Sequence, residues 1–477
     1  MASNDRFVRS TCMTAVFRAI QGQYSGHLSL SIFLPIIGVI HTWSPDLVSI
    51  NPPRSNGGNC PIAITGIGAI SAYGIGAEEF YRGLMSARPV IRAVKLPGAE
   101  GQGHVWWSVV RDFEPLDWMS DKVRDGSDVV TQWLLAAARQ AIDQSGLDPD
   151  PLRTAIVQGT SMGGAHSVMQ AQFALDRQGP SAFPRKTMMK ALANMGAAQI
   201  AMLYKLHGPS LTVSTACAST LDALGTGSRL IASGQADAAV VGGAEAGHSL
   251  DSGDRESGFV PAMAFAPAMF GMQSADTDVA RSCRPFDANR SGIATSEGAA
   301  GFVLERADLA EAREAPIFGY LRGYASLADA YHPSAPDPSG KWEALAMQQA
   351  LDGSGLDADG IDCVYAHATG TPIGDTPEIR AINSLYGSRD RTMPVTSVKG
   401  HFGHAAAASG GMSLIAGLRN MADGVVVNTA NTTDPDPEAR FEVVLSSPRE
   451  LAIRAFQVNA FGFGGQNASI VVSRHRH

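Results

Sequence analysis

The chain has 477 residues, of which 45% are hydrophobic and 17% are charged, and its formal net charge is −8. This balance is typical of a folded protein with a large core, built as two or three domains or as one large duplicated unit. The acidic balance and the lack of a basic stripe argue against general binding to nucleic acid.

The five cysteines are sparse, and no two of them have the spacing of metal ligands. They stand at Cys12, Cys60, Cys217, Cys283 and Cys363. An odd and scattered set predicts reduced thiols without a disulfide framework, and therefore a cytoplasmic protein.

The first 60 residues differ from the rest of the chain. An apolar stretch over residues 28–40, broken by Pro35, is too short to span a bilayer, and no signal-peptide cleavage site follows it. Residues 49–60 are rich in Pro, Asn and Gly and are typical of a linker. We expect residues 1–60 to form a disordered extension without stable membrane insertion; a membrane-associating segment is the alternative.

From residue 61 onward, strands alternate with helices. The pattern predicts an apolar helix over residues 133–142, then a strand over 154–158 that runs into a loop of small residues, 159–164. Such an alternation predicts mostly parallel sheets that are covered by helices.

Cys217 follows an apolar, β-branched run in the string Val213-Ser-Thr-Ala-Cys217. A helix is predicted from this cysteine to Ser233, with a strand over 236–243 behind it. A thiol at a helix N-terminus is expected to have a lowered pKa and to react as the thiolate. The alternative is that Cys217 is one more buried small residue, since free cysteine is often buried.

An internal repeat indicates the architecture. Residues 141–150 and 350–359 agree at seven of ten positions, and in each copy a strand and a loop of small residues follow. A weaker repeat relates residues 228–232 to 412–416. We therefore expect two duplicated α/β halves, residues 61–308 and 309–477, whose strand ends meet at one site.

His367 opens the loop after the predicted strand of the second half, in His367-Ala-Thr-Gly-Thr371. A lone histidine at a strand end is more often structural than catalytic. The surrounding Gly and Thr residues favour a functional role, because they allow close backbone approach and supply hydroxyl groups to a polar chain.

A third motif, Lys399-Gly-His-Phe-Gly-His404, precedes a run of small residues that can pack as a buried helix. Metal binding by His401 and His404, or a basic surface loop, are the alternatives. Because no Asp, Glu or Cys ligand lies nearby, we expect no metal.

The last motif is Asn459-Ala-Phe-Gly-Phe-Gly-Gly-Gln-Asn467, followed by a strand over 468–473. A glycine-rich turn before a strand is usually only a tight turn. Here Phe461 and Phe463 alternate with glycines, which suits a hinged aromatic gate. The motif is no phosphate loop, because no Gly-Lys-Ser/Thr and no helix follow it.

Together these motifs resemble the β-ketoacyl-[acyl-carrier-protein] synthases, which are condensing enzymes of the thiolase superfamily. The resemblance covers residues 61–473. The motifs that carry it are Ile62–Gly68, Thr215–Cys217, Gly242–Glu245, Arg284–Asp287, Ser296–Gly298, both histidine motifs and Phe461–Gly465. It implies an α/β fold of the thiolase type, with two duplicated halves in αβαβα layers. A Cys-His-His set is similar to that of the elongating, decarboxylating synthases.

The resemblance also implies roles. Cys217 would hold the acyl chain as a thioester, and His367 and His404 would stabilise the enolate formed from a malonyl thioester. Lys399 would orient the site, and Phe461 would gate it and complete an oxyanion hole with its backbone N–H. The motif's two threonines would bind the phosphopantetheine arm, which arrives on acyl carrier protein, so no cofactor of its own is expected. These threonines are Thr369 and Thr371.

Three positions depart from the family pattern. Ala368 stands where glycine is usual, Ser413 where many freestanding synthases have glutamate, and Gln466 where threonine is usual. The rest of the first histidine motif, Thr369–Asp375, and Ser413 are closer to modular polyketide synthases. They favour a specialised polyketide or modified-lipid pathway over housekeeping fatty-acid synthesis.

The alternatives concern partners. The chain is expected to form a homodimer; it could instead be a subunit that is active only with a chain-length-factor-like partner, or a non-catalytic chain-length factor. A thioester hydrolase using Cys217 alone is a further reading. An acidic carrier protein calls for a basic docking patch, and four residues are candidates: Lys122, Arg124, Arg185 and Lys186.

Overall fold

The structure is a computed structural model, which describes residues 61–95, 104–246 and 262–476. The extension predicted over residues 1–60 lies outside the described residues. Within the described parts, no helix is both long and apolar enough to cross a membrane.

Strands from both predicted halves join in one mixed sheet, in the order β14-β12-β11-β16-β17-β10-β1-β9-β7-β5-β6, with β2 paired to β1. The first half contributes β1 (Ile62–Ser71), β2 (Gly74–Ile75), β5 (Thr154–Gly159), β6 (Ser210–Val213), β7 (Ala238–Glu245) and β9 (Gly298–Arg306). The second half contributes β10 (Gly319–Ala328), β11 (Cys363–Tyr365), β12 (Pro394–Thr396), β14 (Glu442–Val443), β16 (Ala455–Gly462) and β17 (Gln466–Ser473).

The strand order is the same in both halves when it is counted outward from the central pair β1–β10. The order β1, β9, β7, β5, β6 on one side matches β10, β17, β16, β11, β12 on the other. The strand directions match as well: the first two pairings are antiparallel and the next two are parallel on each side. This repetition is the structural counterpart of the repeat seen in the sequence.

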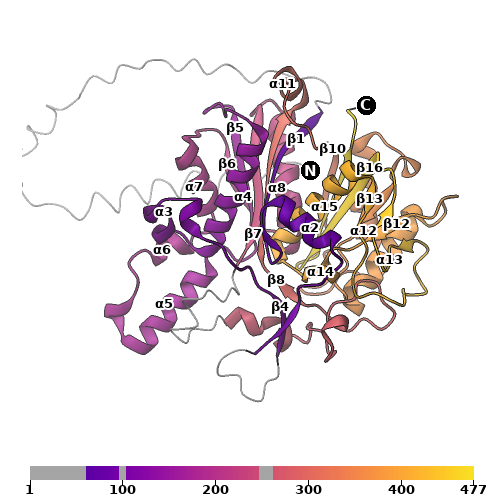
Figure 1. The fold of residues 1–477 in the computed structure, drawn as a ribbon, viewed down its shortest axis with the longest axis horizontal. Helices are drawn as coiled ribbons and strands as arrows, with labels where there is room; N and C mark the ends of the chain where they lie inside the picture. Colours follow the sequence, from indigo (N-terminus) through magenta and orange to yellow (C-terminus); the bar gives the residue numbers. More distant parts are fainter. Residues whose placement is uncertain (1–60, 96–103, 247–261, 477) are drawn as a thin grey trace, which may run out of the picture. The chain divides into compact units, whose positions relative to one another are not determined.

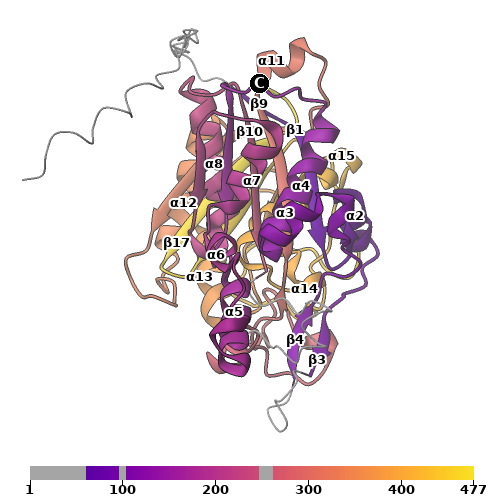
Figure 2. The ribbon, with the colours of Figure 1, turned by 90° about the vertical axis from the view of Figure 1, so that its left-hand side faces the viewer.

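Helices form three layers around the two half-sheets. The middle layer is α8 (Ser219–Ala232) with α15 (Ser409–Asp423), and Figure 1 shows this pair between the strands of the two halves. The outer helices of the first half are α3 (Asp121–Gly126), α4 (Val129–Ser145), α5 (Ala165–Gln178), α6 (Thr187–Ala191) and α7 (Met195–Tyr204), which face the viewer in Figure 2. The outer helices of the second half are α12 (Lys341–Ser354) and α13 (Pro372–Tyr386).

The remaining elements are short or connect these layers. They are α2 (Ala77–Met85), α10 (Ala266–Met269), α11 (Ala307–Ala312), α14 (Lys399–Phe402), β3 (Arg92–Val94), β4 (Val105–Ser108), β8 (Thr295–Ser296), β13 (Val425–Val426) and β15 (Arg449–Glu450). Single turns of 3₁₀ helix are η1 (Pro115–Asp117), η2 (Pro180–Ala182), η3 (Ala216–Ala218), η4 (Ala262–Phe265), η5 (Val279–Arg281), η6 (Ala358–Gly360) and η7 (Ala406–Ala408).

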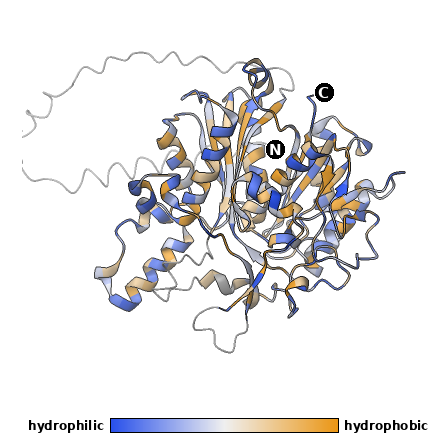
Figure 3. Ribbon diagram, viewed as in Figure 1, coloured by the Kyte–Doolittle hydropathy of each residue, from blue (hydrophilic) through white to orange (hydrophobic). Residues whose placement is uncertain are grey.

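Each layer boundary holds an apolar core. One core packs α4, through residues such as Trp133 and Leu134, against the first half-sheet. A second lies around α8 and α15, and a third packs α12 and α13 against the second half-sheet. In Figure 3 the strands are mostly orange and α3 is mostly blue, as expected for buried strands and an exposed helix.

The apolar helix predicted over residues 133–142 is α4, and its ends show why it forms there. The Asp128 carboxylate accepts a hydrogen bond from the Val130 N–H at 3.1 Å and caps the first turn. Gly146 ends the helix with a left-handed φ of 61°. The predicted fold class, an α/β thiolase-like fold in αβαβα layers, is confirmed.

Candidate active site

The nucleophile lies where β6 turns into the middle helix layer. Cys217 lies in η3, and α8 begins two residues later at Ser219. Ala216, just before the cysteine, has a left-handed φ of 49°. The Ser219 hydroxyl accepts a hydrogen bond from the Thr215 N–H at 3.0 Å and donates one to the Ala216 carbonyl at 2.6 Å, which holds this strained turn in place.

The turn brings the cysteine to a histidine of the second half. The Cys217 Sγ lies 3.0 Å from Nε2 of His404, and the other ring nitrogen of His404 lies 2.8 Å from the Ser409 hydroxyl. A base bonded to the nucleophile on one side and held by a third group on the other is the arrangement of an activated nucleophile. The predicted pairing of these two motifs is therefore present in the structure.

The expectation that the helix lowers the pKa of the Cys217 thiol is wrong. Burial raises this pKa to about 11, and the nearby Lys399 ammonium only partly opposes that effect. Only one turn of 3₁₀ helix surrounds the cysteine, so the loss of solvent outweighs the helix dipole. The thiol is therefore protonated at neutral pH and must lose its proton to a base during reaction.

His367 lies beside this pair. Its ring centroid is 5.3 Å from that of His404, with the rings nearly perpendicular, and 5.9 Å from the ring of Phe461. Burial, followed by the charge of Lys399, lowers the pKa of His367 well below its usual value. A neutral imidazole can donate a hydrogen bond to a substrate oxygen without bringing a full charge.

Lys399 and Glu378 fix the backbone around His367. The buried Lys399 ammonium donates a hydrogen bond to the His367 carbonyl, and burial lowers the pKa of this lysine. The Glu378 carboxylate accepts from the N–H groups of His367 and Ala368, at 2.8 and 2.7 Å. Burial raises the pKa of Glu378 to about 7. Sequence reasoning missed Glu378; its only signal was an acidic residue about two helical turns beyond the His367 loop.

The two threonines of the His367 loop lie together at the start of α13. Their hydroxyls are 3.0 Å apart, and Thr371 caps the helix by accepting a hydrogen bond from the Gly374 N–H at 3.0 Å. Asp375 accepts bonds from the N–H groups of Thr369 and Gly370. The loop is therefore held by its own contacts, and among the described residues the Thr369 hydroxyl bonds only to that of Thr371.

The two aromatic residues of the gate motif differ in burial. Phe461 is buried near the end of β16, whereas the Phe463 side chain is 48% exposed. The backbone N–H groups of Cys217 and Phe463 favour the thiolate and so lower the pKa of the Cys217 thiol, against the larger effect of burial. The geometry thus favours Phe463 as the backbone donor, while the role predicted for Phe461 stays a prediction.

His401 takes no part in this cluster. Its Nε2 lies 2.7 Å from the Asn428 carbonyl, and burial lowers the pKa of His401 to about 4. Since His404 turns instead toward Cys217, the two histidines face different partners. This geometry speaks against the alternative in which they share a metal ion.

The proposed docking residues lie on α3 and just before α6. Lys122, Arg185 and Lys186 are exposed, whereas Arg124 forms ion pairs with Asp121 and Asp125. Arg124 and Lys186 both lower the pKa of Asp125, which shows that the two segments are close. The patch therefore contains acidic as well as basic groups, and its role stays a prediction.

Comparison with known proteins agrees with this geometry. Residues 59–310 match the family model "Beta-ketoacyl synthase, N-terminal domain", and residues 318–433 match "Beta-ketoacyl synthase, C-terminal domain". A 3-oxoacyl-[acyl-carrier-protein] synthase 2 from Synechocystis sp. is 31% identical over 418 residues, which are 87% of this chain and 98% of the relative. One from Coxiella burnetii is 30% identical with the same coverage.

Solved structures show the same fold. The ishigamide ketosynthase/chain length factor has a TM-score of 0.78 and 32% identity, and the match covers 88% of this chain and all of that one. A β-ketoacyl synthase from Burkholderia phymatum has a TM-score of 0.77 and 26% identity, over 87% of this chain and all of that one. With these matches and the Cys217–His404–His367 cluster, the chain belongs to the β-ketoacyl synthase family of condensing enzymes.

Proposed function

We propose that this enzyme joins an acyl chain held on Cys217 to the two-carbon unit of malonyl-[acyl-carrier protein]. The 3.0 Å contact between Cys217 Sγ and His404 Nε2 is the observation that carries the proposal. In the first step Sγ attacks the acyl thioester, the bond from the acyl carbon to the donor sulfur breaks, and the thiol proton passes through His404 to the leaving thiol. The N–H groups at the Cys217 sulfur support an oxyanion there.

In the second step the malonyl thioester loses carbon dioxide. The electron pair of the broken carbon–carbon bond forms an enolate, whose oxygen would accept hydrogen bonds from His367 and from His404, once Nε2 of His404 has taken up a proton from solvent. The enolate carbon then attacks the acyl carbonyl, the bond from that carbon to the Cys217 sulfur breaks, and the departing thiolate takes the Nε2 proton, which restores the Cys217 thiol. The lowered pKa of His367 supports this role, because a neutral imidazole is a donor that does not compete by holding the malonyl carboxylate as an ion pair.

The substrates would arrive on acyl carrier protein, the partner that the names of the curated relatives contain. The phosphopantetheine arm of the carrier would lie along Thr369 and Thr371, so the enzyme needs no cofactor of its own. The exposed Lys122, Arg185 and Lys186 support carrier docking near α3 and α6. With its sparse cysteines, the protein would work in the cytoplasm.

A second chain would pair with this one along β6. This strand ends the sheet, and among the described strands it pairs only with β5. Apolar side chains are exposed on it and on the adjacent helices, including Leu211, Met202, Leu203 and Met188. An unpaired edge beside an apolar surface is typical of a subunit interface. We propose a homodimer; the likeness to a ketosynthase/chain length factor keeps a heterodimer as the alternative.

The product is proposed to be a specialised polyketide or modified lipid. Ala368 and Ser413 depart from the pattern of freestanding fatty-acid synthases, and both are buried close to the catalytic loops. The 32% identity to the ishigamide ketosynthase/chain length factor supports the same direction.

Intact-protein mass spectrometry with an acyl-carrier thioester tests the chemistry. Wild-type protein should gain one acyl group on Cys217, and Cys217→Ala should gain none. Malonyl-carrier protein should then be decarboxylated and the chain extended by two carbons, with the rate of His404→Ala lower by at least about a hundredfold. Acylation that is equal in Cys217→Ala would refute the nucleophile; acyl transfer without decarboxylation would favour a simple acyltransferase or hydrolase.

A further inference from the structure

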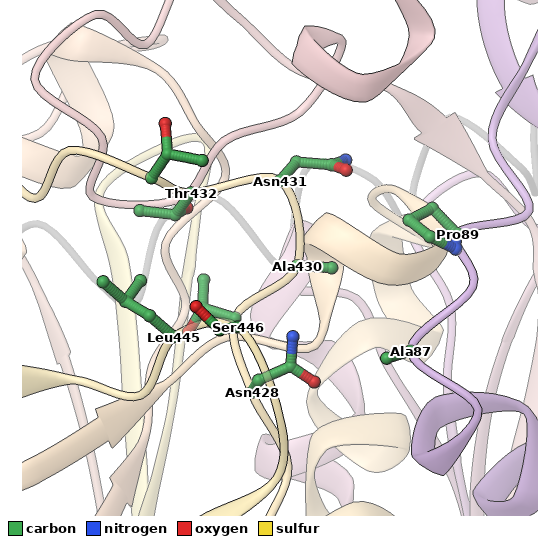
Figure 4. A pocket seen from close by; sticks show the side chains of 10 residues that line it. Ala87, Pro89, Asn428, Ala430, Asn431, Thr432, Leu445 and Ser446 are labelled. Carbon is green, nitrogen blue, oxygen red and sulfur yellow. The ribbon is translucent and has the colours of Figure 1, made fainter.

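A polar cavity of about 270 Å³ lies beside α14, and none of the residues that line it is assigned above to catalysis. Figure 4 shows its lining, which comes from two segments of the second half and the residues after α2. The lining residues are Ala87, Pro89, Asn428, Thr429, Ala430, Asn431, Thr432, Thr433, Leu445 and Ser446. At this volume the cavity suits a molecule smaller than a typical drug-sized ligand.

Asn428 gives the cavity a recognition group. Its side chain is only 4% exposed, and among the described residues its buried Oδ1 atom has no hydrogen-bond partner and no hydrogen bond of its amide nitrogen is found. Figure 4 shows this amide among the side chains that line the cavity. A buried amide oxygen without a partner is destabilising. Whichever way the amide is turned, a bound molecule could satisfy one of its ends.

The lining specifies the chemistry of the occupant. It contains amides and hydroxyls, with Ala87, Pro89 and Leu445 as apolar walls, and no charged side chain lines it. Three of the lining residues hold a left-handed backbone: Ala87 at φ 50°, Asn431 at φ 69° and Ser446 at φ 62°. Such strain in residues other than glycine is common where a backbone clamps a ligand. A small uncharged polyol, whose hydroxyls both donate and accept, fits these groups.

The segment Asn428–Asn431, which forms one wall of the cavity, is hydrogen-bonded directly to α14. The Asn428 carbonyl lies 2.7 Å from Nε2 of His401, and Asn431 Nδ2 donates to the Gly400 carbonyl at 2.9 Å. Gly400 approaches this wall so closely that an added Cβ would lie 2.1 Å from the Ala430 carbonyl oxygen. A displacement of the wall must therefore move α14, the helix that starts at Lys399 and leads into His404.

We propose that this cavity is a binding site for a small uncharged polyol and that its occupation shifts α14. Binding itself does not depend on the proposed function; only the effect on the condensation rate rests on it. A polyol that orders the wall would alter how Lys399 and His404 are held, and would therefore change kcat more than KM.

Saturation-transfer NMR on the full chain tests binding, with myo-inositol as the probe and glucuronate as an anion of similar size. Myo-inositol should bind in the millimolar range and glucuronate at least tenfold more weakly. Asn428→Leu, which keeps the side-chain volume, should bind myo-inositol at least tenfold more weakly. Ser447→Trp, on an exposed neighbour outside the lining, should bind as the wild type does.

Thermal unfolding supplies the second readout. Without polyol, Asn428→Leu should have a Tm equal to or above that of the wild type, because it removes an unpaired buried amide. A lower Tm would show that the amide is structural and would overturn the proposal, as would equal binding of myo-inositol by wild type and variant or no binding at 100 mM. Should Asn428→Leu fail to fold, Thr433→Trp, which fills the cavity from its exposed rim, must abolish binding.

Discussion

Lys399 is buried and Cys217 and His367 are partly buried, and loss of solvent is the largest influence on the pKa of all three. Burial favours the neutral form of each group. The positive charge of Lys399 favours a thiolate, so it lowers the pKa of the Cys217 thiol and opposes the effect of burial there. The same charge disfavours an imidazolium, so it lowers the pKa of His367 in the same direction as burial. A single buried ammonium thus prepares the cysteine to lose its proton and keeps the neighbouring histidine neutral.

The first prediction concerns the reactivity of Cys217. Because the pKa of its thiol is raised to about 11, the thiolate fraction should rise about tenfold per pH unit between pH 6 and 9. The rate of alkylation by iodoacetamide, followed by peptide mass spectrometry at Cys217, should rise in the same way. A plateau reached by pH 7 would mean a lowered pKa and would restore the helix-dipole expectation. The Cys217→Ala variant should lack the label at this position, which identifies Cys217 as the alkylated residue.

Glu378 carries the second prediction. Its carboxyl pKa is raised from 4.5 to about 7 in the folded protein, so folding is favoured by the protonated form. The contribution of protonated Glu378 to the free energy of unfolding is complete below pH 4.5 and is lost as pH rises through 7. The free energy of unfolding falls by about 3 kcal/mol over this range. Glu378→Gln lacks this dependence.

Thermal unfolding between pH 5 and 8 measures this linkage. The Tm of the wild type should fall relative to that of Glu378→Gln as pH rises, even though the variant is less stable at low pH because Gln cannot accept from both N–H groups. Parallel Tm curves would show that the pKa of Glu378 is not raised. Other buried carboxyl groups change both proteins alike and cancel in the difference.

At the scale of elements, the same turn is built twice. Ala216 before α8 and Ala406 before α15 both have a left-handed φ, at 49° and 44°, and each is the first residue of one turn of 3₁₀ helix. Ser219 and Ser409 occupy the same position in the two copies. The first copy holds the nucleophile; in the second, Ser409 positions the ring of His404.

The third prediction concerns the end of β16, which presses against the nucleophile turn. A Cβ on Gly462 would lie 2.9 Å from the Thr215 carbonyl oxygen and 3.0 Å from the Cys217 nitrogen, both backbone atoms. Gly462→Ala should therefore displace η3 and lower the rate of Cys217 acylation about ten- to a hundredfold, at a stability cost of about 1–3 kcal/mol.

Gly126→Ala serves as the control, because an added Cβ there meets nothing within 4 Å. It should acylate at the wild-type rate. Acylation by Gly462→Ala at that same rate would mean that the backbone approach of β16 is irrelevant to the position of the nucleophile.

Predictions from sequence succeeded for these elements where the pattern was local. The predicted strands over 154–158 and 236–243 correspond to β5 and β7, and the helix from Cys217 to Ser233 to η3 with α8. The hydrogen bonds of Glu378 to the His367 loop depend on how that loop folds back on α13, and the effect of the Phe463 N–H on Cys217 depends on a contact across the fold; spacing in the sequence reveals neither. The pKa of Cys217 was misjudged because the helix start is visible in sequence and the depth of burial is not.

At the scale of the whole molecule, the duplication distributes the chemistry between the two halves. The first half supplies Cys217, and the second supplies His367, Lys399 and His404. Among the described strands, the two half-sheets join where Ile62–Ile64 pairs with Gly319–Leu321. The helices α8 and α15 fill the space between the half-sheets, and the nucleophile turn meets the corresponding turn that precedes Ser409. The same symmetric order leaves β6 at one end of the sheet, where among the described strands it pairs only with β5.

The last prediction concerns that edge. Met202 on α7 is 59% exposed, and α7 packs beside β6, so a second copy that covers this face would bury Met202. Met202→Glu would then place an unpaired carboxylate in the interface, which costs several kcal/mol. Analytical ultracentrifugation at about 1 μM should show a dimer for wild type and a monomer for the variant. Leu345→Glu, on the exposed face of α12, should stay dimeric. A monomeric wild type would exclude the homodimer and favour the heterodimer. A dimeric Met202→Glu would mean that the dimer interface lies elsewhere on the molecule.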